Sequence, residues 1–140
     1  MRKIGLDIGD VRIGVAVSDF SGIIATPRET YARRTDEADA AFFGELAKKE
    51  QADEIIVGLP VNMDGSLGAR AVLVKAYGEM LSRALPDIAI SYMDERLTTV
   101  QAERALIASD VRRGRRKEII DKVAAGLILQ TYLDKKNRAR

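Results

Sequence analysis

The stretch that decides the fold is the pair of segments KIGLDIG, residues 3–9, and RIGVAVS, residues 12–18. In both segments apolar residues alternate with small or polar ones, which is typical of strands with one buried face. A tight turn joins them, so they predict a β-hairpin. Asp7 lies mid-strand, on the face that carries Gly5 and Gly9. A carboxylate is costly to bury without a cation, and glycines cannot cover it, so we expect Asp7 to stay open for a metal ion.

The rest of the chain alternates strand and helix patterns. A third strand is expected at residues 22–31, where Pro27 favours an edge position or a bulge. Ser66 is expected to cap a helix whose inward face includes Val72 and Leu73. Further strands are expected at 54–59 and 88–93, and helices at 36–49, 66–84, 98–108 and 118–133. This order predicts an α/β protein with a mixed five-stranded sheet, three antiparallel strands followed by two parallel ones, flanked by helices.

Composition excludes several classes of protein and of chemistry. The 140 residues include no histidine and no cysteine. This excludes a His general base, thiol catalysis, disulfides and a His- or Cys-ligated zinc site. Carboxylates are then the expected actors, and they favour Mg²⁺ or Mn²⁺. No apolar run is long enough to span a membrane and the chain enters a strand at once, so we expect a cytoplasmic protein without membrane contact. One domain, 1–134, is expected, followed by a basic tail, 135–140.

Charge is distributed unevenly. Residues 1–103 contain 12 Lys and Arg against 17 Asp and Glu, whereas residues 104–140 contain 11 against 4. A polyanion such as nucleic acid would therefore meet the C-terminal part first. Five cations lie around a single glycine, and we interpret them as an arm between two helices that clamps phosphates; a solvated loop is the alternative. They are Arg112, Arg113, Arg115, Arg116 and Lys117.

Three acidic positions have settings unlike those of ordinary surface acids. Two-metal phosphoryl transfer needs carboxylates that converge from separate elements. Besides Asp7, the pair Asp94–Glu95 follows a predicted strand, at the carboxyl end where ligands of parallel sheets bind. We expect one of the two acids to reach the site. Asp121 lies on a helix that is apolar almost all round. We therefore expect these acids to share divalent cations.

Each acid also has an ordinary structural interpretation. Asp7 could be a satisfied buried residue, and the Asp94–Glu95 pair could be acids favoured at a helix start. Asp121 could pair with Lys117 or Lys122. We favour one shared metal site over the alternative that all three acids have separate structural roles.

Three further polar residues are candidate contacts to nucleic acid. Arg96 could hold the unused acid of the Asp94–Glu95 pair or a phosphate. Arg12 could contact a phosphate or lie across the sheet edge. Asn62 follows a strand in a turn-rich loop and could face substrate at a helix N-terminus, or simply form a turn. The few aromatic residues form no base-stacking platform, so recognition should depend on backbone and shape.

The same residues make the sequence resemble the YqgF-like family, described as Holliday junction resolvases and as pre-16S ribosomal RNA nucleases. Four motifs in order carry the resemblance nearly from end to end. One small departure is Asp10-Val11, where family members often carry Thr and Lys, and this adds negative charge near the expected site. The motifs are DIG at 7–9 with RIGVA at 12–16 and Ser18-Asp19, GLP at 58–60 with NMDGS at 62–66, DERLTT at 94–99, and Asp121 with Ala124-Ala125.

The resemblance implies a ribonuclease-H-like fold and a divalent-metal nuclease in which Asp7, Glu95 and Asp121 take the catalytic acid positions. It also implies maturation of the 5′ end of pre-16S rRNA, in which ribosomal particles are possible partners, with junction resolution as the older assignment. A four-way junction asks for a two-fold dimer whereas RNA trimming needs one site, and the sequence leaves monomer and homodimer open.

Two other functions compete. Actin- and sugar-kinase-type ATP-handling domains also open with an Asp-x-Gly hairpin, but they need two lobes and this chain has room for one. A non-catalytic RNA-binding assembly factor could keep the fold without useful activity.

Overall fold

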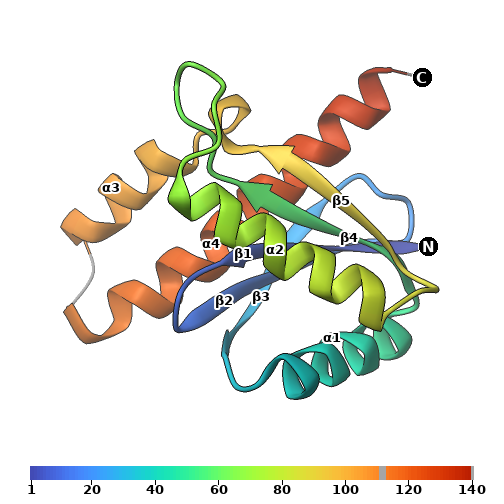
Figure 1. Ribbon diagram of the computed structural model, residues 1–140. Coiled ribbons are helices and arrows are strands. Elements are labelled where there is room, and N and C mark those ends of the chain that lie inside the picture. The colour runs from blue at the N-terminus through green and yellow to red at the C-terminus, as the bar shows by residue number, and fades with distance from the viewer. Residues whose placement is uncertain (111–112, 140) are drawn as a thin grey trace.

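The computed structural model describes the backbone of residues 1–110 and 113–139, and within these ranges it does not describe the side chains of residues 101, 108, 110 and 113–118. In these ranges, five strands and four α-helices form three layers (Figure 1). No helix in these ranges is long and apolar enough to cross a lipid bilayer. The elements are β1 (Arg2–Ile8), β2 (Arg12–Ser18), β3 (Ala25–Ala32), α1 (Asp36–Glu50), β4 (Ala52–Leu59), α2 (Ala69–Ala84), β5 (Ala89–Asp94), a 3₁₀ helix (Glu95–Leu97), α3 (Val100–Asp110) and α4 (Arg113–Arg138).

The sheet confirms the mixed five-stranded topology. Its order is β3-β2-β1-β4-β5, with β1, β2 and β3 antiparallel and with β4 and β5 parallel to β1. β3 is an edge strand, and its register with β2 shifts where Val15 pairs with Glu29 and Ala16 with Pro27. The expectation that Pro27 marks an edge or a bulge is therefore confirmed, since proline cannot donate to a second neighbouring strand.

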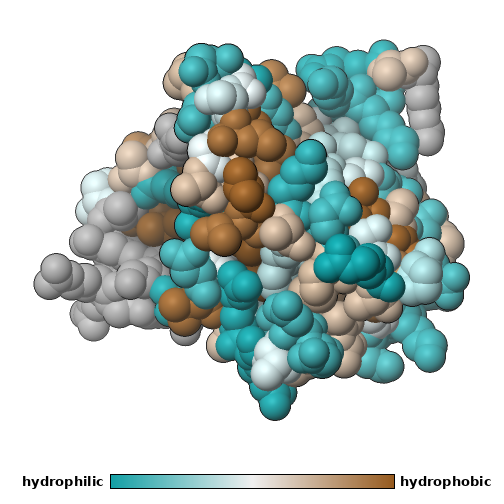
Figure 2. All heavy atoms as spheres, viewed as in Figure 1, coloured by the Kyte–Doolittle hydropathy of each residue, from teal (hydrophilic) through white to brown (hydrophobic). Residues whose placement is uncertain are grey.

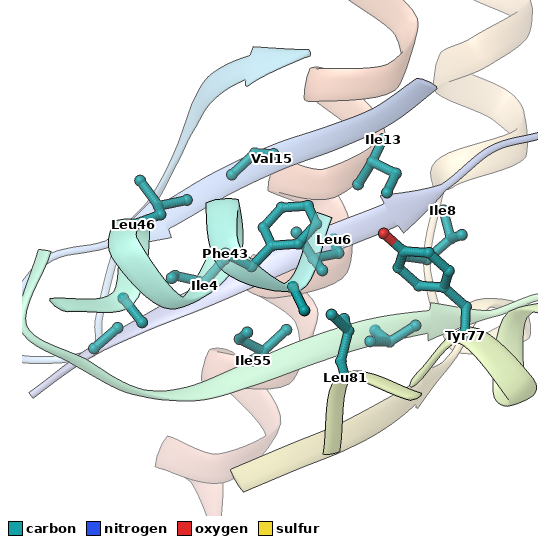
Figure 3. Packing of buried hydrophobic residues seen from close by; sticks show 14 of the residues in the cluster. Ile4, Leu6, Ile8, Ile13, Val15, Phe43, Leu46, Ile55, Tyr77 and Leu81 are labelled. Atoms are coloured by element: carbon teal, nitrogen blue, oxygen red, sulfur yellow. The ribbon is translucent and has the colours of Figure 1, made fainter. Parts of the chain in front are cut away.

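Helices α1 and α2 cover one face of the sheet. The alternating residues of β1 and β2 point into this layer, where Leu6, Ile13 and Phe43 are fully buried (Figure 3). The period-2 pattern thus fixed which face of the hairpin enters this core. Asp39 of α1 is also fully buried, and it accepts hydrogen bonds from the hydroxyls of Tyr31 and Tyr77 at 2.7 and 2.8 Å.

Helix α2 differs from the expectation in its start and in its buried face. It begins after Gly68 without a side-chain cap, because the Ser66 hydroxyl donates instead to Asp64 within the preceding loop. The helix is rotated about its axis relative to the expected orientation. Tyr77 faces the core, whereas Val72 and Leu73 are 53% and 65% exposed. Exposed apolar residues gather over the N-terminal part of α2 and the loop before it (Figure 2).

Helix α4 covers the other face of the sheet. It begins at Arg113, so the basic stretch expected as a loop or flexible arm is helical from residue 113 onward. Arg and Lys are good helix formers and a single glycine costs only about 1 kcal/mol, so the helix continues through Gly114. Within the sheet, Gly5 and Gly14 let α4 approach closely. Of the two glycines beside Asp7, Gly5 therefore receives the helix and Gly9 lies against the carbonyl of Arg12, so neither leaves the acid open and Asp7 is only 6% exposed.

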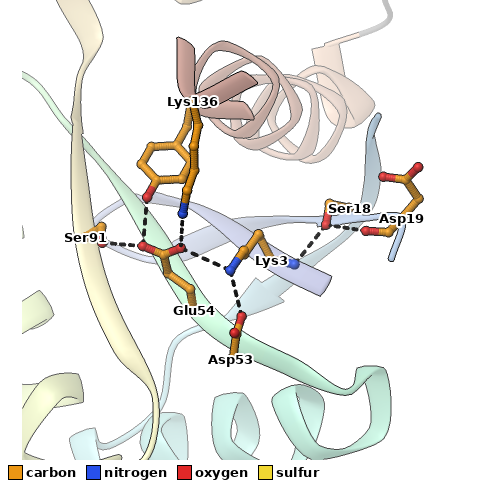
Figure 4. A network of polar contacts seen from close by, with 8 residues as sticks. Lys3, Ser18, Asp19, Asp53, Glu54, Ser91 and Lys136 are labelled. Carbon is orange, nitrogen blue, oxygen red and sulfur yellow. Dashed lines mark hydrogen bonds and ion pairs between the residues drawn. The ribbon is translucent and has the colours of Figure 1, made fainter. Parts of the chain in front are cut away.

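A buried polar network fixes the C-terminal half of α4 at the amino end of β4 (Figure 4). Glu54 accepts hydrogen bonds from Ser91 at 2.6 Å and from Tyr132 of α4 at 2.8 Å. Lys3 and Lys136 lie 3.4 and 3.8 Å from the same carboxylate. Residues 135–138, expected as a tail, continue α4. These contacts set how α4 crosses the sheet, and so where Asp121 lies at the opposite edge.

Candidate functional site

Asp7, Glu95 and Asp121 come together at the carboxyl ends of the strands. Asp7 is near the end of β1 and Glu95 directly follows β5. Because β1, β4 and β5 are parallel, these ends meet at one edge of the sheet. Asp7 pairs with Gly14 across the hairpin, and the main-chain carbonyl of Asp121 lies against Gly14. The acids predicted from distant parts of the sequence therefore share one region, with Asp7 next to both of the others.

Two arginines contact these carboxylates. Arg104 of α3 donates to Asp7, with Nη2 2.8 Å from Oδ1, and its Nη1 is 3.5 Å from Oε1 of Glu95. Arg12 of β2 donates from Nε to Oδ2 of Asp121 at 3.4 Å. The side chains of Asp7 and Glu95 are 8% and 9% exposed. Among the described side chains, Arg12 and Arg104 contact the three acids and the half-exposed Arg70 adds a weaker attraction to Glu95, so an excess of negative charge remains at the buried carboxylates.

The pKa values of the acids reflect this excess of negative charge. Burial, followed by repulsion from Asp7, raises the pKa of Glu95 above its ordinary value. The same two causes raise the pKa of Asp121, although Arg12 partly offsets them. A group of buried acids whose ionised forms are disfavoured attracts further cations.

The donor set fits a hard divalent cation, but the present arrangement of side chains does not yet enclose one. Carboxylate oxygens are the ligands that Mg²⁺ and Mn²⁺ prefer. In the part of the chain that the structure describes, no three acidic or other metal-ligating side chains are grouped closely enough to hold an ion. Arg104 instead occupies the space between Asp7 and Glu95. Joint coordination would require this guanidinium to move.

Asp94 and Glu95, neighbours in the chain, bond to different arginines. Asp94 turns away from the site and accepts hydrogen bonds from the backbone N and Nη2 of Arg96, at 2.9 and 2.7 Å. The Arg96 bond lowers the pKa of Asp94. Of the two roles left open for Arg96, the structure shows the one in which it holds the second acid. Arg96 also donates from Nη1 to the carbonyl of Met63 at 3.2 Å, so it joins the loop after β5 to the loop after β4.

A groove of about 750 Å³ opens beside Glu95. Asn62, Arg70, Arg96 and Arg104 contribute to its lining. Asn62 also has a local role, because its Nδ2 donates to Ser66 Oγ at 3.1 Å within the loop. Of the three acids, Glu95 lines this groove and Asp7 and Asp121 do not, so a bound chain of phosphates would pass directly beside Glu95.

Sequence reasoning missed two arginines of this site. Arg70 donates from Nη2 to the carbonyl of Ile8 at 3.1 Å and lies 3.6 Å from Asp10. Its position in the first turn of α2 was an available signal, because the helix dipole disfavours a cation there. Arg104 lies one turn after Val100, which is 1% exposed, and the shared helix face aims Arg104 at the sheet edge. That signal is weak without the structure.

The predicted basic arm can be placed only by its backbone. Arg112 lies outside the described residues. Arg113, Arg115, Arg116 and Lys117 form the first turns of α4, the helix that carries Asp121, but their side chains are not among those described. Their contact with phosphates stays a prediction.

The architecture defines the class of the protein first: it has the ribonuclease-H-like fold. Thermus thermophilus RuvC in complex with a Holliday junction substrate superposes with a TM-score of 0.61 at 11% identity, covering 98% of this chain and 96% of RuvC. The Fowlpox virus resolvase solved with Holliday junction DNA gives a TM-score of 0.55 at 9% identity, with 97% and 99% coverage. At these identities the likeness concerns the fold.

The chain belongs to the RuvX family, whose model, described as "Holliday junction resolvase", matches residues 1–135. A protein of Halothermothrix orenii named "Putative pre-16S rRNA nuclease" is 50% identical over 138 residues, covering 99% of this chain and 98% of that protein. A relative of the same name from Streptococcus equi subsp. equi is 48% identical over 137 residues, with 96% and 98% coverage. The resemblance inferred from the four motifs is confirmed.

Proposed function

We propose that this chain is a divalent-metal-dependent nuclease that hydrolyses phosphodiester bonds of structured RNA, with the 5′ end of pre-16S rRNA as its substrate. The observation that carries the proposal is the meeting of Asp7, Glu95 and Asp121 at one sheet edge, beside an arginine-lined groove. Membership of a family of nucleases supports the reaction class, and the names of full-length relatives near 50% identity support the RNA substrate.

Asp7, Glu95 and Asp121 would hold Mg²⁺ or Mn²⁺, which, when bound, activates water and stabilises the leaving oxygen. Asp7 would be the central ligand, because it lies on β1, a strand that pairs with β2 on one side and with β4 on the other. The Asp94–Arg96 pair keeps Glu95 turned towards the site. Arg70 and Arg104 would neutralise phosphates in the groove and orient the backbone of the substrate.

Resolution of four-way DNA is the second candidate, because the family model bears that description. The substrates separate in one experiment: the purified chain is incubated with labelled precursor RNA and with four-way DNA, in Mg²⁺, Mn²⁺ or EDTA. We expect metal-dependent cleavage of the RNA. Cleavage confined to symmetric positions of the junction would favour the second candidate.

Asp7→Asn tests the site. We expect it to abolish cleavage with folding intact, whereas Asp87→Asn, an exposed acid before β5, leaves activity unchanged. A fully active Asp7→Asn protein would refute the mechanism. If that variant restores growth or rRNA processing in cells that lack the wild-type protein, the chain acts as a non-catalytic assembly factor instead.

A further inference from the structure

Arg104 occupies the space between two of the proposed metal ligands. Its guanidinium contacts Oδ1 of Asp7 at 2.8 Å and Oε1 of Glu95 at 3.5 Å. These are oxygens that a divalent cation held between Asp7 and Glu95 would also use. The guanidinium and the cation therefore exclude each other by position.

The helix that carries Arg104 packs against α4, but in the part of the chain that the structure describes it makes few contacts with the sheet. Val100 is buried at the start of α3, but no later residue of α3 whose side chain is described is buried. Leu106, further along the helix, is 59% exposed. The two ion pairs of Arg104 are thus a principal tether of α3 to the sheet edge.

We propose that Arg104 is a built-in competitor for the divalent cation: it holds Asp7 and Glu95 when no metal ion is bound, and it is released into the groove when one binds. The inference rests on the proposed function, in which these two acids are metal ligands. One positive charge can balance only one of the two carboxylates, whereas a divalent cation balances both, so the exchange is electrostatically favourable.

The released side chain has a place to go. Arg104 is 33% exposed in the ion pair and already contributes to the lining of the 750 Å³ groove. A guanidinium freed there binds a phosphodiester through a planar, two-pronged contact. Metal binding would thereby prepare the groove for nucleic acid, and Arg104 would act as a positioning residue for the substrate.

Metal affinity measured without nucleic acid tests the competition. Mn²⁺ binding is followed by electron paramagnetic resonance for the wild type, Arg104→Met and Arg83→Met. Methionine keeps an apolar stem but removes the charge, and Arg83 is an exposed arginine near the end of α2. We expect Arg104→Met to bind Mn²⁺ at least about fivefold more tightly, which is the lower end of typical coupling between two binding events. Arg83→Met should match the wild type.

Hydrogen exchange gives a second readout that does not depend on a variant. In the wild type, Mn²⁺ should speed amide exchange within residues 100–110, because the tether is lost. If Mn²⁺ leaves this exchange unchanged or slows it, the competition is refuted, even if Arg104→Met does not fold.

The outcomes separate the two proposals. If Asp7→Asn loses Mn²⁺ binding while Arg104→Met binds it no better than the wild type, the competition is refuted and the metal site stands. If neither the wild type nor Arg104→Met binds Mn²⁺, both proposals are refuted.

Discussion

The main-chain carbonyl oxygen of Asp121 lies against Gly14, where a Cβ would be only 1.8 Å from that oxygen. Gly14 is also the hairpin partner of Asp7. The absence of one side chain therefore sets the distance between the strand that carries the first acid and the helix that carries the third. No residue other than glycine fits at this position without moving α4.

Gly14→Ala should therefore destabilise the fold and displace Asp121. Both contacting groups are backbone, so neither can rotate away, and we expect a loss above about 2 kcal/mol, within the range for overpacked cores. Urea unfolding measures the loss, and cleavage assays below the transition should show reduced activity in the molecules that remain folded.

Gly44→Ala in α1 is the matched control. A Cβ there would meet only the tip of Leu85, at 3.0 Å, and alanine favours the helix. The change in stability should stay within about 1 kcal/mol of wild type. Equal losses for both glycines would show that close approach of α4 at Gly14 is not what matters.

Glu95→Gln should stabilise the protein while abolishing cleavage. Burial and the charge of Asp7 raise the pKa of Glu95 in the folded state, so its ionised form disfavours folding at pH 7. Glutamine removes that charge, and we expect a gain of about 0.5–2 kcal/mol, typical when a functional site is relaxed.

The pH dependence of this gain checks its cause. An acid with a raised folded pKa favours folding increasingly as pH falls, so the wild type recovers stability as Glu95 takes up a proton. The advantage of Glu95→Gln should be full at neutral pH and vanish below the ordinary pKa of glutamate, near 4.3. Urea unfolding between pH 3.5 and 8 measures it; a gain independent of pH would point to packing instead.

Much of the fold could be predicted because short-range rules act consistently there. The period-2 pattern of residues 3–9 and 12–18 assigned both faces of the hairpin, and Pro27 marked the edge. The acidic first turn and basic last turn of α1 placed its ends within one residue. These signals are local, so no tertiary contact was needed to interpret them.

The errors arise where tertiary packing decides between similar local choices. Both faces of α2 carry apolar residues, and packing against the core buries the face that carries Val74 and Tyr77. Gly5 was interpreted from one strand alone, whereas its reason is the approach of α4; Gly9 lies against the carbonyl of Arg12 within the hairpin. Arg104 reaches the acids across separate elements, and no spacing in the sequence reports that contact.

Arg96→Met should loosen the loop after β4 more than it weakens phosphate binding directly. Arg96 joins Asp94 to the carbonyl of Met63, and methionine keeps the stem but makes neither contact. We expect faster amide exchange in residues 61–66 and a fall in the rate of cleavage greater than the fall in affinity for RNA. If the variant binds RNA more weakly while amide exchange in residues 61–66 is unchanged, Arg96 contacts a phosphate, the other role that the sequence left open.

Glu50→Gln should lower stability at neutral pH and lose its effect in acid. Glu50 is 6% exposed and contacts Arg28 and, at 2.6 Å, Arg2. The bond from Arg28, with further help from Arg2, lowers the pKa of Glu50. A carboxylate whose pKa is lowered by folding stabilises the folded state at pH values above its ordinary pKa. This stabilisation is lost as the pH falls through the pKa of the folded state. The deficit of the variant, about 1–3 kcal/mol at pH 7, should shrink below pH 4.5; a constant deficit would mean that the ion pairs are not its source.

Arg70→Met should weaken nucleic-acid binding without regard to sequence. Arg70 is about half exposed at the groove and is held by the carbonyl of Ile8 at the end of β1. Loss of one phosphate contact should lower the slope of log affinity against log salt by about 1. Binding of catalytically inactive Asp7→Asn protein to RNA, titrated in KCl, measures that slope, with Asp7→Asn/Arg83→Met as the matched control at the far end of α2. An unchanged slope in the Arg70 variant would place the path of the phosphates elsewhere, on the N-terminal turns of α4.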